Sequence, residues 1–315
     1  MDPTLKKTAT GNKSQQSNDI KNNFGEQLIF ILSQPRTGST LLTRLLEGHS
    51  DIDALGETRL LQTALMTISK PWREKDSYEL KYSREDTKIF LDSFPSGQSH
   101  YFEGMRFMFN HIYNARLSHS KKIYFLDKTP RYAYFIPELY QSFPKAKYIF
   151  LFRNPLAVLS SITRNWTHYK PPFPNDDLEI VPSALLAGQK LIGDNAISVK
   201  YEDLVTSPEA TLNRLSTYLS LDFESNMLKY NQASQWKTGD KFIYDHNKPA
   251  ANMTTEWEKY LSHPKIWNYS KKYLDILGTE TLSQMGYQYS DIEKTLKKNR
   301  PSMIATCISR FKKGR

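Results

Sequence analysis

The chain has 315 residues, a length that can bury a sizeable core and fits one enlarged α/β domain as well as two smaller ones. Its formal net charge of +10 favours anionic partners such as a nucleotide, an acidic substrate or a membrane surface. The excess is modest for this length, and we expect no nucleic-acid partner. A single cysteine, Cys307, excludes an internal disulfide and a multi-cysteine metal site.

Apolar runs in chain order predict four buried strands, at residues 28–32, 123–126, 147–152 and 196–200. Helical patterns occur between and after them, at about 39–48, 60–66, 76–91, 101–117, 133–140, 155–164, 208–219, 255–261 and 264–277. We expect residues 49–55 to be a connector and residues 166–182, with four prolines, to cross the mouth of the active site. Alternating strands and helices predict a three-layer α/β fold of the P-loop-like type, with a mostly parallel central sheet flanked by helices.

Residues 33–40, Ser-Gln-Pro-Arg-Thr-Gly-Ser-Thr, join the first predicted strand to the first predicted helix. A strand, a tight loop and a helix in this order place backbone N–H groups around one concavity, which binds phosphate-like anions. A nucleotide triphosphatase loop has a lysine directly before its Ser/Thr. Here Ser39 precedes Thr40, and the cation of the loop is Arg36, whose planar fork can hold two oxygens of a phosphate or sulfonate. The loop therefore predicts an anionic ligand without magnesium-dependent triphosphate hydrolysis.

A second motif lies far downstream, where the strand at 147–152 is followed by Arg153-Asn154-Pro155 and then by Ser160 and Ser161. Together, the two motifs resemble the sulfotransferase superfamily that uses 3′-phosphoadenosine 5′-phosphosulfate (PAPS). The resemblance covers residues 27 to about 287. It implies that Arg153 and Ser161 bind the 3′-phosphate, although a sheet-edge arginine and an exposed serine are the structural alternative. It also implies that the 5′-phosphosulfate is held by Arg36 with Thr37, Gly38, Ser39, Thr40 and Leu41, where the alternative is an ordinary turn before a helix.

The stretch Gly56-Glu57-Thr58-Arg59 resembles the part of protein-tyrosine sulfotransferases that carries their catalytic glutamate and a nearby arginine. The resemblance implies that Glu57 is the general base for the acceptor, and that Arg59 steadies Glu57 or contacts the donor. Lys128 matches the lysine that stabilises the bridging oxygen of the leaving phosphate. A helix-capping glutamate and a surface lysine at a strand end are the alternatives.

The same resemblance implies further contacts to the nucleotide. Tyr201 matches a position near the adenine, where an aromatic ring can stack on the base or form a hydrogen bond to it. The polar segment 232–252 is expected to form a lid, in which Gly239, Asp240 and Lys248 could touch the nucleotide. Other branches of the family use a histidine as the base. The histidines that compete with Glu57 for that role are His49, His100, His111 and His119.

The leading hypothesis is therefore sulfuryl transfer from PAPS to a hydroxyl, or an amine, of a small-molecule acceptor by in-line displacement, with no metal ion. A peptidyl tyrosine is a second possible acceptor. Two alternatives remain, a P-loop nucleotide kinase and a non-catalytic protein that binds a nucleotide or a sulfated glycan. The Lys expected of a kinase loop is missing, and Glu57 with Lys128 favours catalysis over binding alone.

The resemblance implies a sulfotransferase domain at 25–289, and composition predicts a disordered tail at 1–24 and a basic tail at 290–315. The first segment is polar and has no apolar core, so we expect neither a secretion signal nor a membrane anchor. With no apolar run long enough to cross a membrane, the expected location is the cytoplasm. The basic C-terminal tail could make a weak contact with an anionic membrane surface, or it could be a solvated helix with a frayed end.

Overall fold

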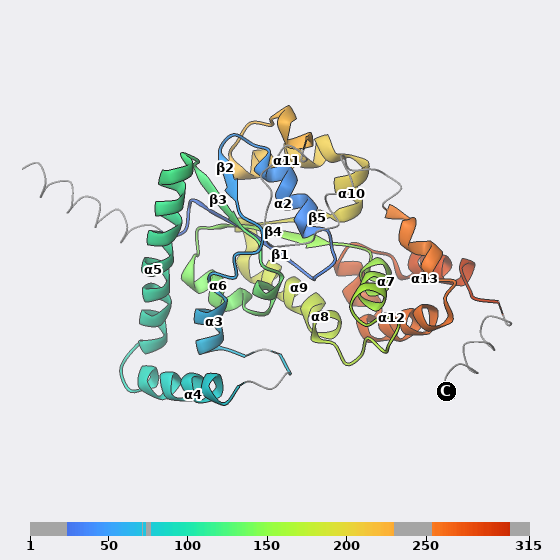
Figure 1. Cartoon of the computed structure of the whole chain (residues 1–315), viewed down its shortest axis with the longest axis horizontal. Coiled ribbons are helices and arrows are strands. Elements are labelled where there is room, and N and C mark those ends of the chain that lie inside the picture. The colour runs from blue at the N-terminus through green and yellow to red at the C-terminus, as the bar shows by residue number, and fades with distance from the viewer. Residues whose placement is uncertain (1–23, 71, 74–76, 230–253, 303–315) are drawn as a thin grey trace, which may run out of the picture.

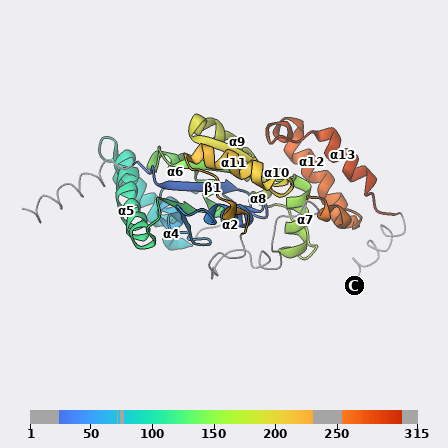
Figure 2. The same ribbon diagram turned by 90° about the horizontal axis from the view of Figure 1, so that it is seen from above.

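The computed structural model describes residues 24–70, 72–73, 77–229 and 254–302. Within these ranges the strands form a five-stranded sheet in the order β2-β3-β1-β4-β5, and each adjacent pair is parallel. Helices flank this central sheet (Figure 1, Figure 2). The strands are β1 (Leu28–Ser33), β2 (Ile52–Ala54), β3 (Tyr124–Asp127), β4 (Lys147–Phe152) and β5 (Ala196–Lys200). The predicted α/β fold with a parallel central sheet is confirmed.

The central strand β1 is buried along its whole length, as its unbroken apolar run predicts. Successive side chains of a strand point to opposite faces of the sheet, and β1 supplies a core on each face. Leu28, Phe30 and Leu32 pack into the core on the first face. Ile29 and Ile31 pack into the core on the second face.

Helices on the two faces complete the three layers. The helices whose residues pack around Phe30 on the first face are α3 (Gln62–Ile68), α5 (Gly97–Ser120), η1 (Pro130–Tyr134), α6 (Ile136–Ser142) and α9 (Val181–Ile192). Those that pack around Ile31 on the second face are α2 (Ser39–Glu47), α10 (Tyr201–Thr206), α11 (Pro208–Leu219) and η3 (Ser225–Leu228). α4 (Tyr78–Asp92) packs against α3 and α5, and η2 (Gly193–Asn195) leads into β5.

A third core lies at one side of the sheet, opposite the side where α4 and α5 stand (Figure 1). Its elements are α7 (Pro155–Asn165), α8 (Asp176–Glu179), η7 (Glu256–Tyr260), α12 (Pro264–Gln284) and α13 (Tyr289–Lys298). The expected start of a C-terminal tail at residue 290 falls inside α13, whose Ile292 and Leu296 are buried in this core. In the part of the chain that the structure describes, no helix is both long and apolar enough to span a membrane.

Several local features differ from the sequence-based expectations. The connector at 49–55 contains β2, whose three residues are too few to show a periodic pattern. The proline-containing segment 166–182 holds α8 and the first two residues of α9, and neither α9 nor α10 was expected as a helix. The segment at 255–261 is a 3₁₀ helix.

The packing of α13 gives a stability prediction. Replacing the buried Leu296 by alanine should lower the free energy of unfolding by about 2–4 kcal/mol, because the change leaves a cavity in the third core. Chemical denaturation followed by circular dichroism measures this loss. Leu191→Ala is the matched control, since Leu191 is 51% exposed and should change the free energy by about 0.5 kcal/mol or less. Equal small effects of both variants would show that α13 contributes no core.

Candidate active site

Each strand of the sheet leads into a residue predicted to act in the site. The residues that follow β1, β2, β3, β4 and β5 in this way are Arg36, Glu57, Lys128, Arg153 and Tyr201. Because the strands are parallel, their carboxyl ends lie along one edge of the sheet, which is where open α/β sheets bind ligands. The topology therefore gathers side chains that are far apart in the sequence.

The loop between β1 and α2 has the backbone shape of an anion-binding turn. Arg36 and Gly38 both have positive φ angles, of 67° and 93°, and Gly38 is the N-cap residue of α2. Its lack of a side chain leaves the first-turn amide groups of α2 without a capping side chain, so they can bind an anion. A Cβ atom on Gly38 would lie 2.4 Å from a ring carbon of Tyr201. The close approach and the positive φ both require glycine at this position.

Arg36 connects this loop to the second predicted anion motif. The Arg36 Nε donates a hydrogen bond to Ser161 Oγ on α7, at 3.0 Å. Arg153 donates from Nη1 to the main-chain carbonyl of Arg36, at 3.1 Å. The structure thus brings the residues predicted for the two ends of a nucleotide into one cluster.

Arg153 has further capacity to bind a ligand. Its guanidinium carbon lies 4.0 Å from the centre of the Tyr201 ring, a cation–π contact. Its buried Nε has no hydrogen-bond partner in the structure. Burial raises the pKa of the Tyr201 hydroxyl, and the positive charge of Arg153 opposes that rise. A cation with an unsatisfied donor next to an aromatic ring suits a phosphate beside a base.

The predicted base and the predicted lysine form an ion pair. Lys128 Nζ lies 3.1 Å from Glu57 Oε1, and it also donates to Thr40 Oγ1 in the first turn of α2, at 3.4 Å. Lys128 has no exposed surface, so the alternative of a surface lysine is wrong. Arg59 reaches Glu57 Oε2 at 3.7 Å, with its side chain 63% exposed. Lys128 therefore joins the Glu57 carboxylate to the first turn of α2.

Asp127 anchors the segment that carries Glu57. Its Oδ1 accepts a hydrogen bond from the Thr58 hydroxyl at 2.8 Å, and its Oδ2 accepts from Tyr113 at 2.6 Å and Tyr132 at 3.2 Å. Burial raises the pKa of the Asp127 carboxyl, and these three hydrogen bonds oppose the rise. Thr58 is thus fixed to the end of β3, one residue away from Lys128.

The histidines that compete with Glu57 have other surroundings. His49 is buried just beyond the C-terminal end of α2, where its Nδ1 accepts from the Asp51 amide and its Nε2 contacts the Asp222 carbonyl. His100, His111 and His119 are exposed residues of α5. These positions favour structural or surface roles for all four.

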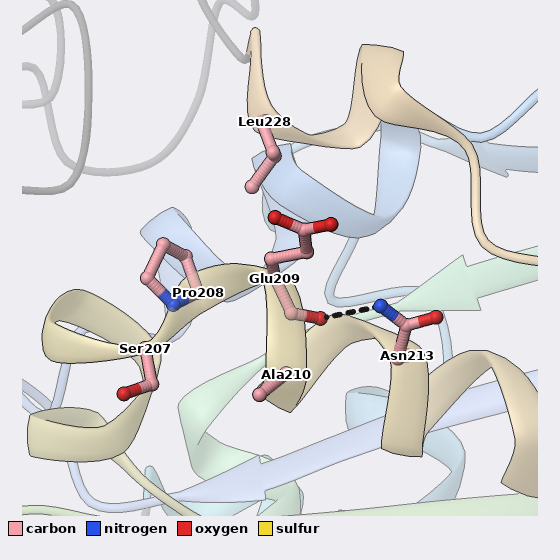
Figure 3. Close-up of a pocket in the computed structure, with 6 residues that line it drawn as sticks. All are labelled: Ser207, Pro208, Glu209, Ala210, Asn213 and Leu228. Carbon is pink, nitrogen blue, oxygen red and sulfur yellow. Dashed lines mark hydrogen bonds between the residues drawn. The ribbon is translucent and has the colours of Figure 1, made fainter.

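Gly239, Asp240 and Lys248, predicted to belong to a lid, lie outside the described residues. Among the residues that are described, no group of three or more His, Cys, Asp or Glu side chains could hold a metal ion. Figure 3 shows an open hollow between α11 and η3, and no predicted site residue lines it. Its lining residues are Ser207, Pro208, Glu209, Ala210, Asn213 and Leu228.

Comparison with known proteins assigns the chain to a family. The profile of the sulfotransferase family matches residues 28–225, which include all five strands of the sheet. The chain belongs to the sulfotransferase family. The family resemblance inferred from the two anion motifs is confirmed, and the match ends before η7, α12 and α13.

Individual relatives are distant from this sulfotransferase-family chain. Nodulation protein NoeE of Sinorhizobium fredii is 25% identical over 292 residues, covering 84% of this chain and 66% of that protein. Protein-tyrosine sulfotransferase A of Caenorhabditis elegans is 25% identical over 213 residues, covering 65% of this chain and 52% of that protein. The chain thus spans less than two thirds of the length of each of these curated relatives.

A solved structure supports the fold. The sulfotransferase domain from the curacin biosynthetic pathway superposes with a TM-score of 0.54 at 22% sequence identity. The match covers 82% of this chain and 97% of that chain. At this level of identity, the likeness concerns the fold.

Sequence reasoning missed residues that position the site. Asp127 lies between the predicted strand at 123–126 and Lys128. A carboxylate directly after a buried strand is a sequence signal for a polar group near the site. Gln34 lies inside the recognised loop, where it is 1% exposed and donates to the Asp177 carbonyl at 2.8 Å. No local pattern links Gln34 to Asp177, because the two residues are 143 positions apart.

The glycine at the start of α2 gives a second prediction. Gly38→Ala should lower the free energy of unfolding by about 2–5 kcal/mol, because alanine is strained at this φ and its methyl group overlaps the Tyr201 ring. The same change at Gly104 is the matched control. Gly104 lies inside α5 with no atom within 4 Å of an added Cβ, so alanine should stabilise by about 0.5–1 kcal/mol. Thermal unfolding with calorimetry measures both, and a stable Gly38→Ala variant would contradict the described loop.

Proposed function

We propose that the protein transfers a sulfuryl group from PAPS to a hydroxyl group of a small-molecule acceptor, with Glu57 as the general base. One observation carries the proposal. Lys128 is fully buried and contacts both the Glu57 carboxylate, at 3.1 Å, and Thr40 in the anion-binding loop, at 3.4 Å. This arrangement supports a site in which an acceptor-side base and a donor-side loop share one cation.

The 5′-phosphosulfate end of the donor fits the loop before α2. The amide groups at the start of α2 and the Arg36 side chain supply donors for its oxygens. The hydroxyl groups of Ser39 and Thr40 belong to the same first turn. This mode of binding requires no metal ion, because amide dipoles and a guanidinium group offset the charge of the anion.

The 3′-phosphate end fits the neighbouring cluster. Arg153 has an unsatisfied buried Nε, and Ser161 lies within hydrogen-bond distance of Arg36. Tyr201 contacts the Arg153 guanidinium through its ring and is suited to stack on the adenine. Closeness of the two predicted phosphate sites supports one donor molecule that spans both.

The chemistry assigned to the residues is a single displacement. A bond forms between the acceptor oxygen and sulfur while the bond from sulfur to the bridging oxygen of the 5′-phosphate breaks. Glu57 accepts the proton of the acceptor hydroxyl, and Lys128 stabilises the negative charge that develops on the bridging oxygen. As Glu57 becomes neutral, the charge of Lys128 is balanced by the leaving bisphosphate. The products are the sulfated acceptor and adenosine 3′,5′-bisphosphate.

A peptidyl tyrosine is the second acceptor that the comparisons support. One relative is a protein-tyrosine sulfotransferase, and the segment Gly56–Arg59 resembles such enzymes. The nucleotide kinase alternative lacks support, since Ser39 stands where the kinase lysine would be. The pairing of Glu57 with the buried Lys128 favours a catalytic protein over one that only binds a nucleotide or glycan.

Label transfer tests the proposed function directly. The protein is incubated with PAPS labelled with sulfur-35 and a panel of alcohols, phenols, amines and a tyrosine peptide, with and without EDTA. We expect a labelled organic product from a small hydroxyl compound, with a rate that EDTA leaves unchanged. Labelling of the peptide alone would show that the acceptor is a peptidyl tyrosine. Loss of labelling in EDTA would show that the reaction depends on a metal ion.

Arg36 should be essential for binding the donor. We expect Arg36→Ala to weaken adenosine 3′,5′-bisphosphate roughly 10- to 100-fold in isothermal calorimetry, because charge-assisted hydrogen bonds to the nucleotide are lost. Arg214→Ala removes the same charge from an exposed residue of α11 and is the control. If Arg36→Ala binds adenosine 3′,5′-bisphosphate as tightly as the wild type, the loop does not belong to the donor site.

Glu57 should act on turnover and not on donor affinity. We expect Glu57→Gln to lower the turnover number by a factor of roughly 10² to 10⁴, the usual contribution of a general base. Its affinity for adenosine 3′,5′-bisphosphate should stay near the wild-type value. The exposed Glu103 of α5 provides the control change, Glu103→Gln. Full activity of Glu57→Gln would assign the base to another residue.

A further inference from the structure

We propose that the C-terminal helical segment is part of the donor site, because the hydroxyl groups of Tyr273 and Tyr287 hold the two anion-binding loops in place. Both tyrosines lie beyond residue 225, where the family match ends. They are positioning residues, since each acts through a second side chain. The inference rests on the proposed function for the identity of the ligand, adenosine 3′,5′-bisphosphate.

Tyr273 of α12 holds the loop that follows β1. Its hydroxyl accepts a hydrogen bond from Gln34 Nε2 at 3.2 Å, and the same Nε2 donates to the Asp177 carbonyl at 2.8 Å. Gln34 and Tyr273 are both buried, with 1% and 0% of their surface exposed. Gln34 stands two positions before Arg36, so α12 and α8 together fix the entry of the loop.

Tyr287, which follows α12, holds the loop after β4. Its hydroxyl donates to Glu202 Oε2 at 2.7 Å. The other oxygen of Glu202 accepts from the main-chain amide of Asn154 at 2.9 Å. Asn154 is the N-cap residue of α7 and directly follows Arg153, so the chain from Tyr287 to Asn154 fixes the Arg153 turn.

A second contact holds Tyr287 against the end of β5. Lys200 Nζ donates to the Gly286 carbonyl at 2.5 Å and lies 5.1 Å from the centre of the Tyr287 ring. Gly286 has a φ of 84°, a left-handed conformation that favours glycine. Burial raises the pKa of both tyrosine hydroxyls, which keeps them protonated near neutral pH.

Removal of either hydroxyl should loosen one loop without creating a large cavity. In Tyr273→Phe, the buried amide of Gln34 loses an acceptor, and in Tyr287→Phe, the Glu202 carboxylate loses a donor. A loosened loop must be ordered again when the ligand binds, and that cost lowers affinity. Tyr148 is the control, because it is as fully buried as Tyr273 but its hydroxyl donates to the Phe143 carbonyl, outside both loops.

The first test compares ligand affinity with stability. Isothermal calorimetry measures the binding of adenosine 3′,5′-bisphosphate to the wild-type chain, Tyr273→Phe, Tyr287→Phe and Tyr148→Phe, and thermal unfolding is recorded for each. We expect both loop variants to bind about 3- to 10-fold more weakly, the effect of one hydrogen bond, and Tyr148→Phe to bind like the wild type. Lowered melting temperatures with unchanged affinities would show a merely structural role and overturn the inference.

The second test separates the two loops by using half-ligands. Adenosine 5′-monophosphate reports on the loop near Gln34, and adenosine 3′-monophosphate reports on the loop near Arg153. Because hydrogen bonds join the two loops, each variant should affect both half-ligands, but unequally: Tyr273→Phe should weaken the 5′-monophosphate more than the 3′-monophosphate, and Tyr287→Phe the reverse. Equal weakening of both by either variant would contradict the assignment.

The outcomes distinguish this inference from the proposed function. A wild-type chain that fails to bind the bisphosphate would overturn the proposed function and this inference with it. A wild-type chain that binds, with loop variants that bind equally well, would overturn this inference alone.

Discussion

The hydrogen bond from the Arg153 guanidinium to the main-chain carbonyl of Arg36 joins the two loops on which the candidate site depends. It forms because β1 and β4 are parallel neighbours in the sheet, with Ser33 paired to Leu151 in register. The two loops therefore leave the sheet at nearly the same height. Arg36 and Arg153 are 117 positions apart in the sequence, yet a hydrogen bond joins them directly. A single ligand could therefore contact both loops.

The fold and the centre of the site could be predicted from the sequence because their signals are local. An apolar run followed by Pro35 and Gly38 predicts β1 and its loop, and the resemblance to the family proposes Glu57 and Lys128, which the structure brings within 3.1 Å of each other. The supporting contacts could not be predicted, because they join distant residues. Gln34 and Tyr273 are 239 positions apart, and nothing near either residue indicates the other. Short elements such as β2 were missed because three residues show no period.

Electrostatics gives the buried part of the site its character. Lys128 has no exposed surface, and a buried cation is costly without a partner. Glu57 at 3.1 Å supplies that partner, and the hydroxyl of Thr40 offers an acceptor. Nearby, the Asp127 carboxylate is surrounded by the hydroxyl groups of Thr58, Tyr113 and Tyr132. The polar groups around Lys128 and Asp127 thus hold one another in place, whereas Arg153 Nε, also buried, has no hydrogen-bond partner in the structure.

The two edge strands of the sheet, β2 and β5, have features that limit pairing with a strand of another molecule. β2 is only three residues long, and its Asp53 is held by two hydrogen bonds from Arg116 of α5. On the opposite border, Arg214 of α11 donates to the Ser198 carbonyl of β5. A short or covered border offers a poor template for a strand from another molecule. Intermolecular sheet extension, a common route to aggregation, is therefore disfavoured at both borders.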